Sequence, residues 1–187
     1  RISFLIFIVV LGIESARQTV ARLKKGRRVE ELEQFALNDS MTGMYNRNAY
    51  DYFVKNEKDF EGYVIVTFDL NNLKQCNDQY GHRAGDEYII NAAHIIEDNF
   101  ERYGKCYRIG GDEFCCIIPK GRYFKIERVM HKIDQDVEIL NHKNIIPVPV
   151  GIAYGYAVFT ADDTDPEKVR ERADEDMYRN KKTMKQL

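Results

Sequence analysis

The most informative stretch of the chain is Arg108-Ile109-Gly110-Gly111-Asp112-Glu113-Phe114. It places two glycines and two carboxylates between apolar, strand-like segments at 105–109 and 114–118. A glycine pair between two such segments predicts a tight β-hairpin, because glycine accepts the positive φ that hairpin turns need. Glycine also lets a large ligand approach the backbone, since it has no Cβ. Taken alone, the pattern fits an ordinary solvated hairpin tip equally well.

A second polar cluster lies upstream, at the end of a predicted buried strand. Residues 62–70 (GYVIVTFDL) are rich in β-branched and aromatic side chains, which predicts a strand with Asp69 at its C-terminal end. A buried carboxylate there is unfavourable unless it is paired. If Asp69 faces Asp112 and Glu113, repulsion among the three carboxylates raises their pKa values unless a cation shares them.

Such a cluster predicts a site for divalent cations and phosphate. Carboxylate oxygens without a His or Cys cluster suit Mg²⁺ or Mn²⁺. Two such ions clamp the attacking and leaving oxygens of an in-line phosphoryl transfer. Lys74 follows Asp69 on the next helical turn, where its ammonium would neutralise phosphate charge. We therefore expect a metal-dependent phosphoryl-transfer site.

Four segments of the chain carry a recognisable pattern in a fixed order: 39–47 (DSMTGMYNR), 69–86 (DLNNLKQCNDQYGHRAGD), 110–114 (GGDEF) and 173–181 (ADEDMYRNK). Together they resemble the GGDEF domain of diguanylate cyclases, over about residues 38–187. This family joins two GTP molecules into cyclic di-GMP and releases pyrophosphate, so the resemblance implies a nucleotidyltransferase. The alternative is a catalytically silent receptor for GTP or cyclic di-GMP. Such receptors usually lose signature carboxylates, whereas this chain keeps all three.

The resemblance implies a metal-binding role for four positions. Asp69 would hold two Mg²⁺ or Mn²⁺ ions, with the Leu70 carbonyl assisting and with Asp112 and Glu113 completing the cage. Asp112 or Glu113 would also be available to help deprotonate the attacking 3′-hydroxyl, although a metal-lowered pKa could suffice.

The resemblance also implies how GTP would be held. Asn77 and Asp86 match the pair that binds the guanine edge, since a carboxylate accepts from N–H donors that adenine does not present together. The remaining positions are the hairpin glycines Gly110 and Gly111, the helix-start amides near Asn72 and Leu73, and the phosphate-binding lysines Lys74, Lys181 and Lys185.

The chain departs from the family pattern at the product-inhibition motif R-x-x-D. Its first and last positions fall on Glu101 and Gly104, and neither residue fits. We therefore predict that feedback inhibition through this primary site is absent.

The composition excludes several other classes of protein. A net charge of −2 argues against a broad nucleic-acid-binding surface, so affinity for phosphate must be local. No G-x-x-x-x-G-K-(S/T) motif occurs, which excludes a P-loop NTPase. The four cysteines show no C-x-x-C spacing and are typical of reduced thiols in the cytoplasm.

The N-terminal part differs in composition from the rest. Residues 1–13 contain a continuous apolar run that is too short to cross a bilayer, which needs about twenty residues. Since the chain starts with Arg1, this run is expected to be the end of a transmembrane helix of a longer protein with an upstream sensor domain; a buried core helix is the alternative. The basic residues that follow would place the catalytic domain in the cytoplasm, anchored to the bacterial cell membrane.

Residues 14–37 read as one continuous helix without proline. Its apolar residues repeat at three- and four-residue spacing with an interruption at 26–28, which favours a parallel homodimer with a shift of register. A helix packed on its own domain is the alternative. A dimer would bring two GTP sites together, as the joining of two nucleotides requires.

The catalytic domain is then expected at 38–187, with an α+β fold. Helices are predicted at about 46–58, 85–101, 121–141 and 165–182, and strands at 62–70, 105–109, 114–118 and 149–159. This β-α-β-β-α-β order predicts a ferredoxin-like, palm-type sheet that contains antiparallel strands and has helices on one face.

Overall fold

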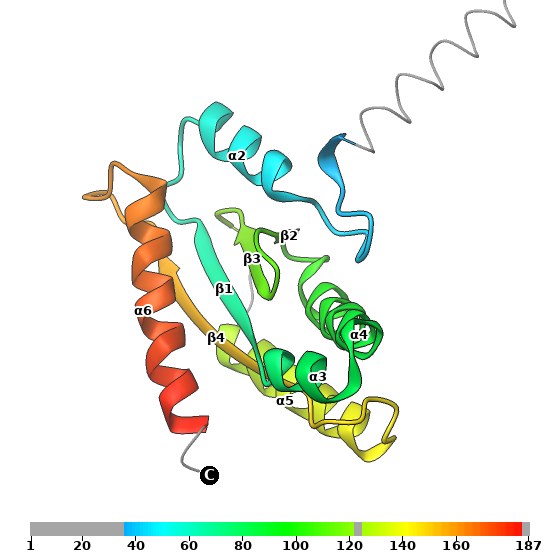
Figure 1. Cartoon of the computed structure of the whole chain (residues 1–187). Coiled ribbons are helices and arrows are strands. Elements are labelled where there is room, and N and C mark those ends of the chain that lie inside the picture. The colour runs from blue at the N-terminus through cyan, green and yellow to red at the C-terminus, as the bar shows by residue number, and fades with distance from the viewer. Residues whose placement is uncertain (1–35, 122–124, 185–187) are drawn as a thin grey trace, which may run out of the picture. The chain divides into compact units, whose positions relative to one another are not determined.

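The computed structural model describes residues 36–121 and 125–184. The domain that begins at Asn38 forms one compact unit (Figure 1). The predictions for the apolar run 1–13, for nearly all of the helix at 14–37 and for Lys185 fall outside the described residues. No helix within the described ranges is both long enough and apolar enough to cross a bilayer.

Helices and strands alternate in a pattern that confirms the predicted α+β fold. The sheet has the strand order β2-β3-β1-β4, and every neighbouring pair is antiparallel. The two central strands, β1 and β3, are the ones that carry the acidic residues of interest. The elements are α2 (Arg47–Asn56), β1 (Val64–Asn71), α3 (Leu73–Tyr80), α4 (His82–Phe100), β2 (Lys105–Arg108), β3 (Glu113–Ile118), α5 (Ile126–His142), β4 (Gly151–Val158) and α6 (Pro166–Met184).

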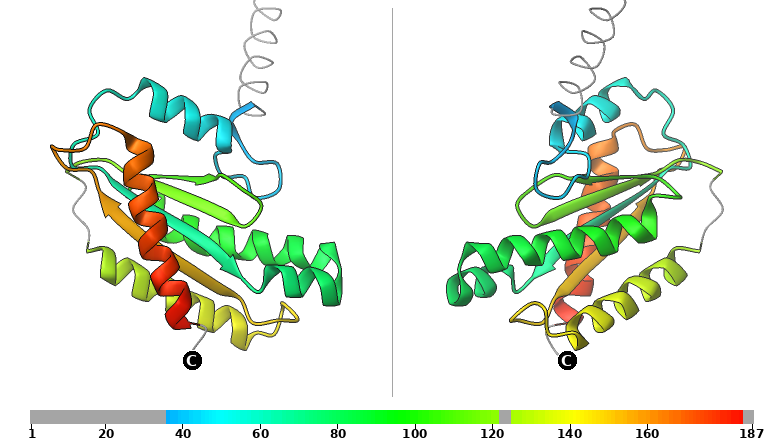
Figure 2. Two further views of the ribbon diagram at one scale, coloured as in Figure 1. Left: turned by 60° about the vertical axis from the view of Figure 1, so that its left-hand side comes forward. Right: turned by 90° about the vertical axis from the view of Figure 1, so that its right-hand side faces the viewer.

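Helices cover both faces of the sheet, so the prediction that they lie on one face is wrong. Figure 2 shows α6 running across one face and α4 and α5 lying against the other. Strand β3 gives the physical reason, because its residues from Phe114 to Ile118 are all buried. Alternate side chains of a strand point to opposite faces, so a strand buried along its whole length needs cover on both.

The larger core lies on the face that α4 and α5 cover. Val66, Phe68 and Leu70 of β1 are buried there together with Ile133 of α5. The ring of Phe68 meets the ring of Phe100 edge to face, with centroids 5.6 Å apart. This packing holds the C-terminal end of β1 rigidly within the sheet.

Helix α6 packs very closely on the other face, over β4. A Cβ atom at Gly155 would lie 2.0 Å from the amide nitrogen of Met177 and 2.4 Å from the carbonyl oxygen of Ala173. Only a residue without a side chain fits this contact. Gly155 is the β4 partner of Thr67 in β1, so α6 is seated over the strand that carries Asp69.

Tyr88 of α4 ties together the ends of two strands. Its hydroxyl donates to the carbonyl of Asn71 at 2.5 Å and accepts from the amide of Gly151 at 2.7 Å. Burial raises the pKa of Tyr88 to about 12, so the hydroxyl keeps the proton that it donates. The end of β1 and the start of β4 are therefore fixed to the same helix.

Two helix boundaries differ from the predicted ones. The helix predicted at 85–101 is preceded by a separate short helix, α3, and Gly81 lies between the two with a φ of 83°. Gly121, which was expected to open a helix, has the same left-handed φ of 83° and lies in a turn, and α5 begins only at Ile126. Both glycines adopt a conformation that a right-handed helix excludes.

The cysteines are free thiols buried in the core. Burial raises the pKa of Cys76, Cys115 and Cys116. These thiols are therefore protonated and weakly nucleophilic at neutral pH.

Candidate active site

The acidic residues of the two sequence clusters meet where β1 and β3 lie side by side. Asp69 is the direct antiparallel partner of Glu113, and the amide of Leu70 donates to the carbonyl of Asp112 at 3.1 Å. Directly opposed residues of an antiparallel pair project to the same face of the sheet. Asp69 and Glu113 therefore share the face that α6 covers.

Helix α6 places a positively charged side chain beside Asp69. The ammonium of Lys181, in the last turn of the helix, forms an ion pair with Oδ1 of Asp69. The two side chains are mostly buried, with 18% of Asp69 and 25% of Lys181 exposed. The predicted phosphate-binding lysine and the predicted metal-binding carboxylate thus contact each other directly.

The carboxylates predicted to form a metal cage lie on or next to two adjacent strands, but their side chains do not form a closed group. Within the described ranges, no three His, Cys, Asp or Glu side chains converge as a metal-binding group. The donor set nevertheless fits Mg²⁺ or Mn²⁺, because it consists of hard oxygen atoms. Asp69 moreover already has a cation, Lys181, as its partner.

The turn between β2 and β3 is built differently from the predicted glycine hairpin. Neither Gly110 nor Gly111 has a positive φ, so the conformational reason given for them is wrong. A Cβ at Gly110 would lie 2.8 Å from Oε2 of Glu113, whereas a Cβ at Gly111 would meet nothing within 4 Å. Gly110 therefore makes room for the acidic side chain, and Gly111 leaves the outside of the turn open to a ligand.

Arg108 anchors this turn, a role that the sequence did not reveal. Its guanidinium donates to Oδ1 of Asp39 at 3.0 Å and to the carbonyl of Gly111 at 2.9 Å. Burial of Asp39 acts to raise its pKa, but hydrogen bonds from Thr42 and Arg108 outweigh burial and hold the pKa below its usual range. The ionised Asp39 thus links the segment that begins the domain to the acidic turn.

The predicted guanine-binding residues lie where α3 meets α4. Asn77 of α3 is half-buried against Gly85 of α4, and Asp86 follows Gly85 with an exposed side chain. The two predicted residues are therefore neighbours in space as well as in the motif.

The start of α3 carries the predicted phosphate-binding groups. Asn72 is the N-cap of the helix and adopts a left-handed φ of 63°. Leu73 is buried, and Lys74 is exposed. Free amides at a helix start bind anions, which agrees with the expected role of this segment.

If Asn77 binds the guanine edge of GTP, as the resemblance implies, replacing Gly85 by alanine should weaken GTP binding roughly five- to tenfold, the value of one or two hydrogen bonds. The new Cβ would lie 2.0 Å from Oδ1 of Asn77 and would push that amide aside. Calorimetric titration with GTP measures the effect. The matched control is the same substitution in an Asn77→Ala background, where it should add nothing. Unchanged affinity in the folded Gly85→Ala protein would contradict the placement of Asn77.

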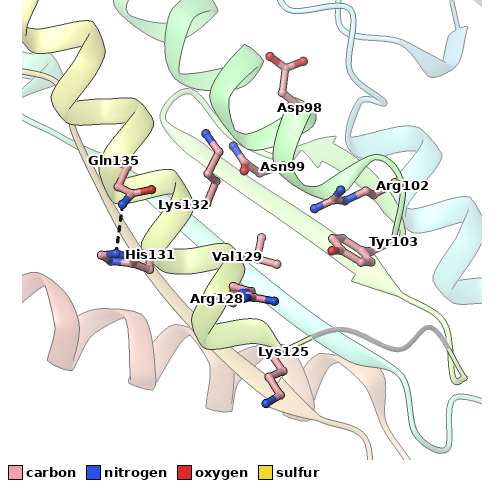
Figure 3. Close-up of a pocket in the computed structure, with 10 residues that line it drawn as sticks. All are labelled: Asp98, Asn99, Arg102, Tyr103, Lys125, Arg128, Val129, His131, Lys132 and Gln135. Carbon is pink, nitrogen blue, oxygen red and sulfur yellow. Dashed lines mark hydrogen bonds between the residues drawn. The ribbon is translucent and has the colours of Figure 1, made fainter.

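A basic cleft lies elsewhere, between the C-terminal half of α4 and the N-terminal half of α5 (Figure 3). It has a volume of about 820 Å³ and belongs to the face of the sheet opposite Asp69. Its charged side chains are Asp98, Arg102, Lys125, Arg128 and Lys132, and the imidazole of His131 also lines it. The cleft adjoins the segment where the product-inhibition motif would lie, and Gly104 in that segment has no room for a side chain, because a Cβ would lie 2.1 Å from the carbonyl oxygen of Ile117.

If the chain catalyses the reaction that the resemblance implies, added cyclic di-GMP is expected not to lower its initial rate through the primary inhibition site, because Glu101 and Gly104 stand at the first and last positions of the R-x-x-D motif. The measurement is the rate of pyrophosphate release from GTP at rising concentrations of the dinucleotide. Gly104→Asp is expected to destabilise the protein rather than to create inhibition, since the close backbone contact must open. Inhibition of the unaltered chain at micromolar product would contradict the prediction.

Comparison with known proteins gives a consistent result. Residues 36–186 match the family model described as the diguanylate cyclase GGDEF domain. The chain is 30% identical to the bifunctional diguanylate cyclase/cyclic di-GMP phosphodiesterase MucR of Pseudomonas aeruginosa, over 89% of this chain and 25% of MucR. It is 28% identical to the diguanylate cyclase DgcS of Shewanella oneidensis, over 81% of this chain and 52% of DgcS. The chain thus spans between a quarter and about half of these relatives.

The fold is likewise similar to that of a solved GGDEF protein. The structure of the coiled coil and GGDEF domain of DgcB from Caulobacter crescentus, in complex with c-di-GMP, superimposes with a TM-score of 0.75. The alignment covers 92% of this chain and 95% of that one at 23% identity.

Proposed function

Because the chain belongs to the GGDEF domain family of diguanylate cyclases, we propose that it condenses two GTP molecules into cyclic di-GMP with release of pyrophosphate. One observation carries the proposal: the antiparallel register sets Asp69 opposite Glu113. Lys181 of α6 forms an ion pair with the carboxylate of Asp69. Two carboxylates and one ammonium therefore lie on one face of the sheet, which supports a role for them in binding cations and phosphate.

Asp69, Asp112, Glu113 and the carbonyl of Leu70 are the groups that would hold two Mg²⁺ or Mn²⁺ ions. Bound there, such ions neutralise phosphate charge and lower the pKa of a hydroxyl. Asp112 or Glu113 would also be available to take the proton of the 3′-hydroxyl. The open side of Gly111 leaves room for the nucleotide beside this turn.

The remaining residues would orient GTP. Asn77 and Asp86 would bind the guanine edge, and the amides at Asn72 and Leu73 would hold phosphate oxygens. Three lysines, Lys74, Lys181 and Lys185, would balance the phosphate charge. Gly110 and Gly111 would let the nucleotide lie against the turn.

Synthesis of a cyclic dinucleotide requires two such sites, since each domain would bind one GTP. We propose a homodimer formed through the helix predicted at 14–37, with positioning of the two nucleotides setting the rate. The same proposal includes an upstream sensor domain and a tether to the bacterial cell membrane through the N-terminus, with the catalytic domain in the cytoplasm.

The test is incubation of the purified dimeric chain with GTP and Mg²⁺, followed by chromatography of the products. Cyclic di-GMP should form from GTP but not from ATP. The double variant Asp112→Ala, Glu113→Ala should form none while its thermal unfolding remains cooperative. Tight GTP binding without any cyclic dinucleotide would reject the proposal in favour of a silent receptor.

A further inference from the structure

The ion pair between Lys181 and Asp69 places an ammonium where a metal ion is expected to bind. Asp69 lies at the end of a central strand with most of its side chain buried. A carboxylate in such surroundings needs a positive partner, because water reaches it poorly. In the structure the ammonium of Lys181 provides that partner.

Two features of α6 favour the ion pair of Lys181 with Asp69. Lys181 lies in the last turn of α6, where the helix dipole favours a positive charge. The close seat of α6 on Gly155 fixes the helix backbone over the sheet. The long and flexible side chain of lysine can nevertheless change partner without any movement of the helix.

A divalent cation and the Lys181 ammonium would compete for Oδ1 of Asp69, because two positive charges beside one carboxylate oxygen repel each other. We propose that Lys181 is an exchangeable counter-ion: it neutralises Asp69 in the nucleotide-free protein and leaves for the triphosphate when metal and nucleotide bind together. The identity of that nucleotide as GTP rests on the proposed function. The exchange itself rests on the ion pair.

Two consequences follow from the exchange. The protein without nucleotide binds divalent metal weakly, because the metal must first displace the Lys181 ammonium from its ion pair with the mostly buried Asp69. Metal and nucleotide then bind with positive cooperativity, since the triphosphate accepts the displaced ammonium, and by linkage each ligand strengthens binding of the other equally.

The experiment compares Lys181→Met with Lys182→Met in the nucleotide-free chain. Both variants remove one positive charge from the same helix turn, but Lys182 is exposed and lies over the ring of Tyr178, 4.3 Å from its centroid. Binding of Mn²⁺ is measured by the electron paramagnetic resonance signal of the free ion. Lys181→Met should bind Mn²⁺ at least about fivefold more tightly than Lys182→Met, and Lys182→Met should resemble the unaltered chain.

The same variants are then titrated with GTP in the presence of Mg²⁺. Lys181→Met should bind GTP more weakly than Lys182→Met, so that one substitution strengthens metal binding and weakens nucleotide binding. Lys181→Gln repeats both measurements with a polar side chain of similar reach. Mn²⁺ affinity in Lys181→Met that is equal to or below that of Lys182→Met, or too weak to detect, would overturn the exchange.

The result separates this inference from the proposed function. Tighter Mn²⁺ binding in Lys181→Met together with no cyclic dinucleotide from the unaltered chain would keep the exchange and reject the cyclase. Normal synthesis with unchanged Mn²⁺ affinity would do the reverse.

Discussion

Replacement of Asp69 by asparagine is expected to reduce cyclic di-GMP synthesis on the order of 10³-fold or more. Asp69 of β1 is paired on both sides, opposite Glu113 of β3 and Ala153 of β4. Asparagine keeps the shape of the side chain and removes the negative charge. The loss should therefore fall on the rate, while the cooperative unfolding of the domain is retained.

The measurement is steady-state product formation, with circular dichroism as the check on folding. Asp98→Asn is the matched control, because Asp98 is an exposed acid in the cleft between α4 and α5, on the other face of the sheet. That variant should retain full activity. An active Asp69→Asn protein would remove this carboxylate from the reaction.

Replacement of Gly155 by alanine is expected to lower the free energy of unfolding by about 3 kcal/mol or more. The three atoms nearest to the new Cβ are backbone atoms of α6, at 2.0, 2.4 and 2.7 Å, so no side chain can rotate away. The helix itself must lift from β4. Because α6 also carries Lys181, the same substitution should weaken GTP binding in whatever protein remains folded.

Urea denaturation of Gly155→Ala and of the unaltered chain measures the difference in their free energies of unfolding. Gly151→Ala on the same strand is the control, since its nearest contact would be Cβ of Asn71 at 3.2 Å, a gap that needs a shift of only a few tenths of an ångström. It should cost much less stability than Gly155→Ala. Equal stabilities for Gly155→Ala and Gly151→Ala would show that α6 packs less closely on β4 than the structure indicates.

The sequence was most informative where chemistry and turn signals coincide. The acidic turn and its flanking strands could be predicted because a glycine pair separates two apolar runs, and β2 and β3 lie within a residue of the expected limits. Asp69 could be placed at a strand end because the run before it is continuously apolar and β-branched. The segment from Phe114 to Ile118 shows no alternation of apolar and polar residues, which is typical of a strand covered on both faces. This signal conflicts with the prediction that the helices lie on one face of the sheet.

The contacts that complete the site could not be predicted, because they join distant parts of the chain. Lys181 and Asp69 are 112 residues apart, and Arg108 and Asp39 are 69 residues apart. Nothing local distinguishes Gly155 from a glycine that merely weakens a strand; its need for the absence of a side chain arises only when α6 lies over it. The limits of α3 could not be predicted, because its eight residues are too few to show a clear helical repeat.

The burial of every native thiol gives this protein a silent background for site-directed labelling. Cys76, Cys106, Cys115 and Cys116 are enclosed in the core, so a maleimide or a nitroxide reagent should modify a single cysteine introduced on the surface and nothing else. Placed at the exposed Tyr80 of α3, a spin label on each of two associated copies would report the distance between their α3 helices. The distance between two associated copies could thus be measured without first replacing any native cysteine.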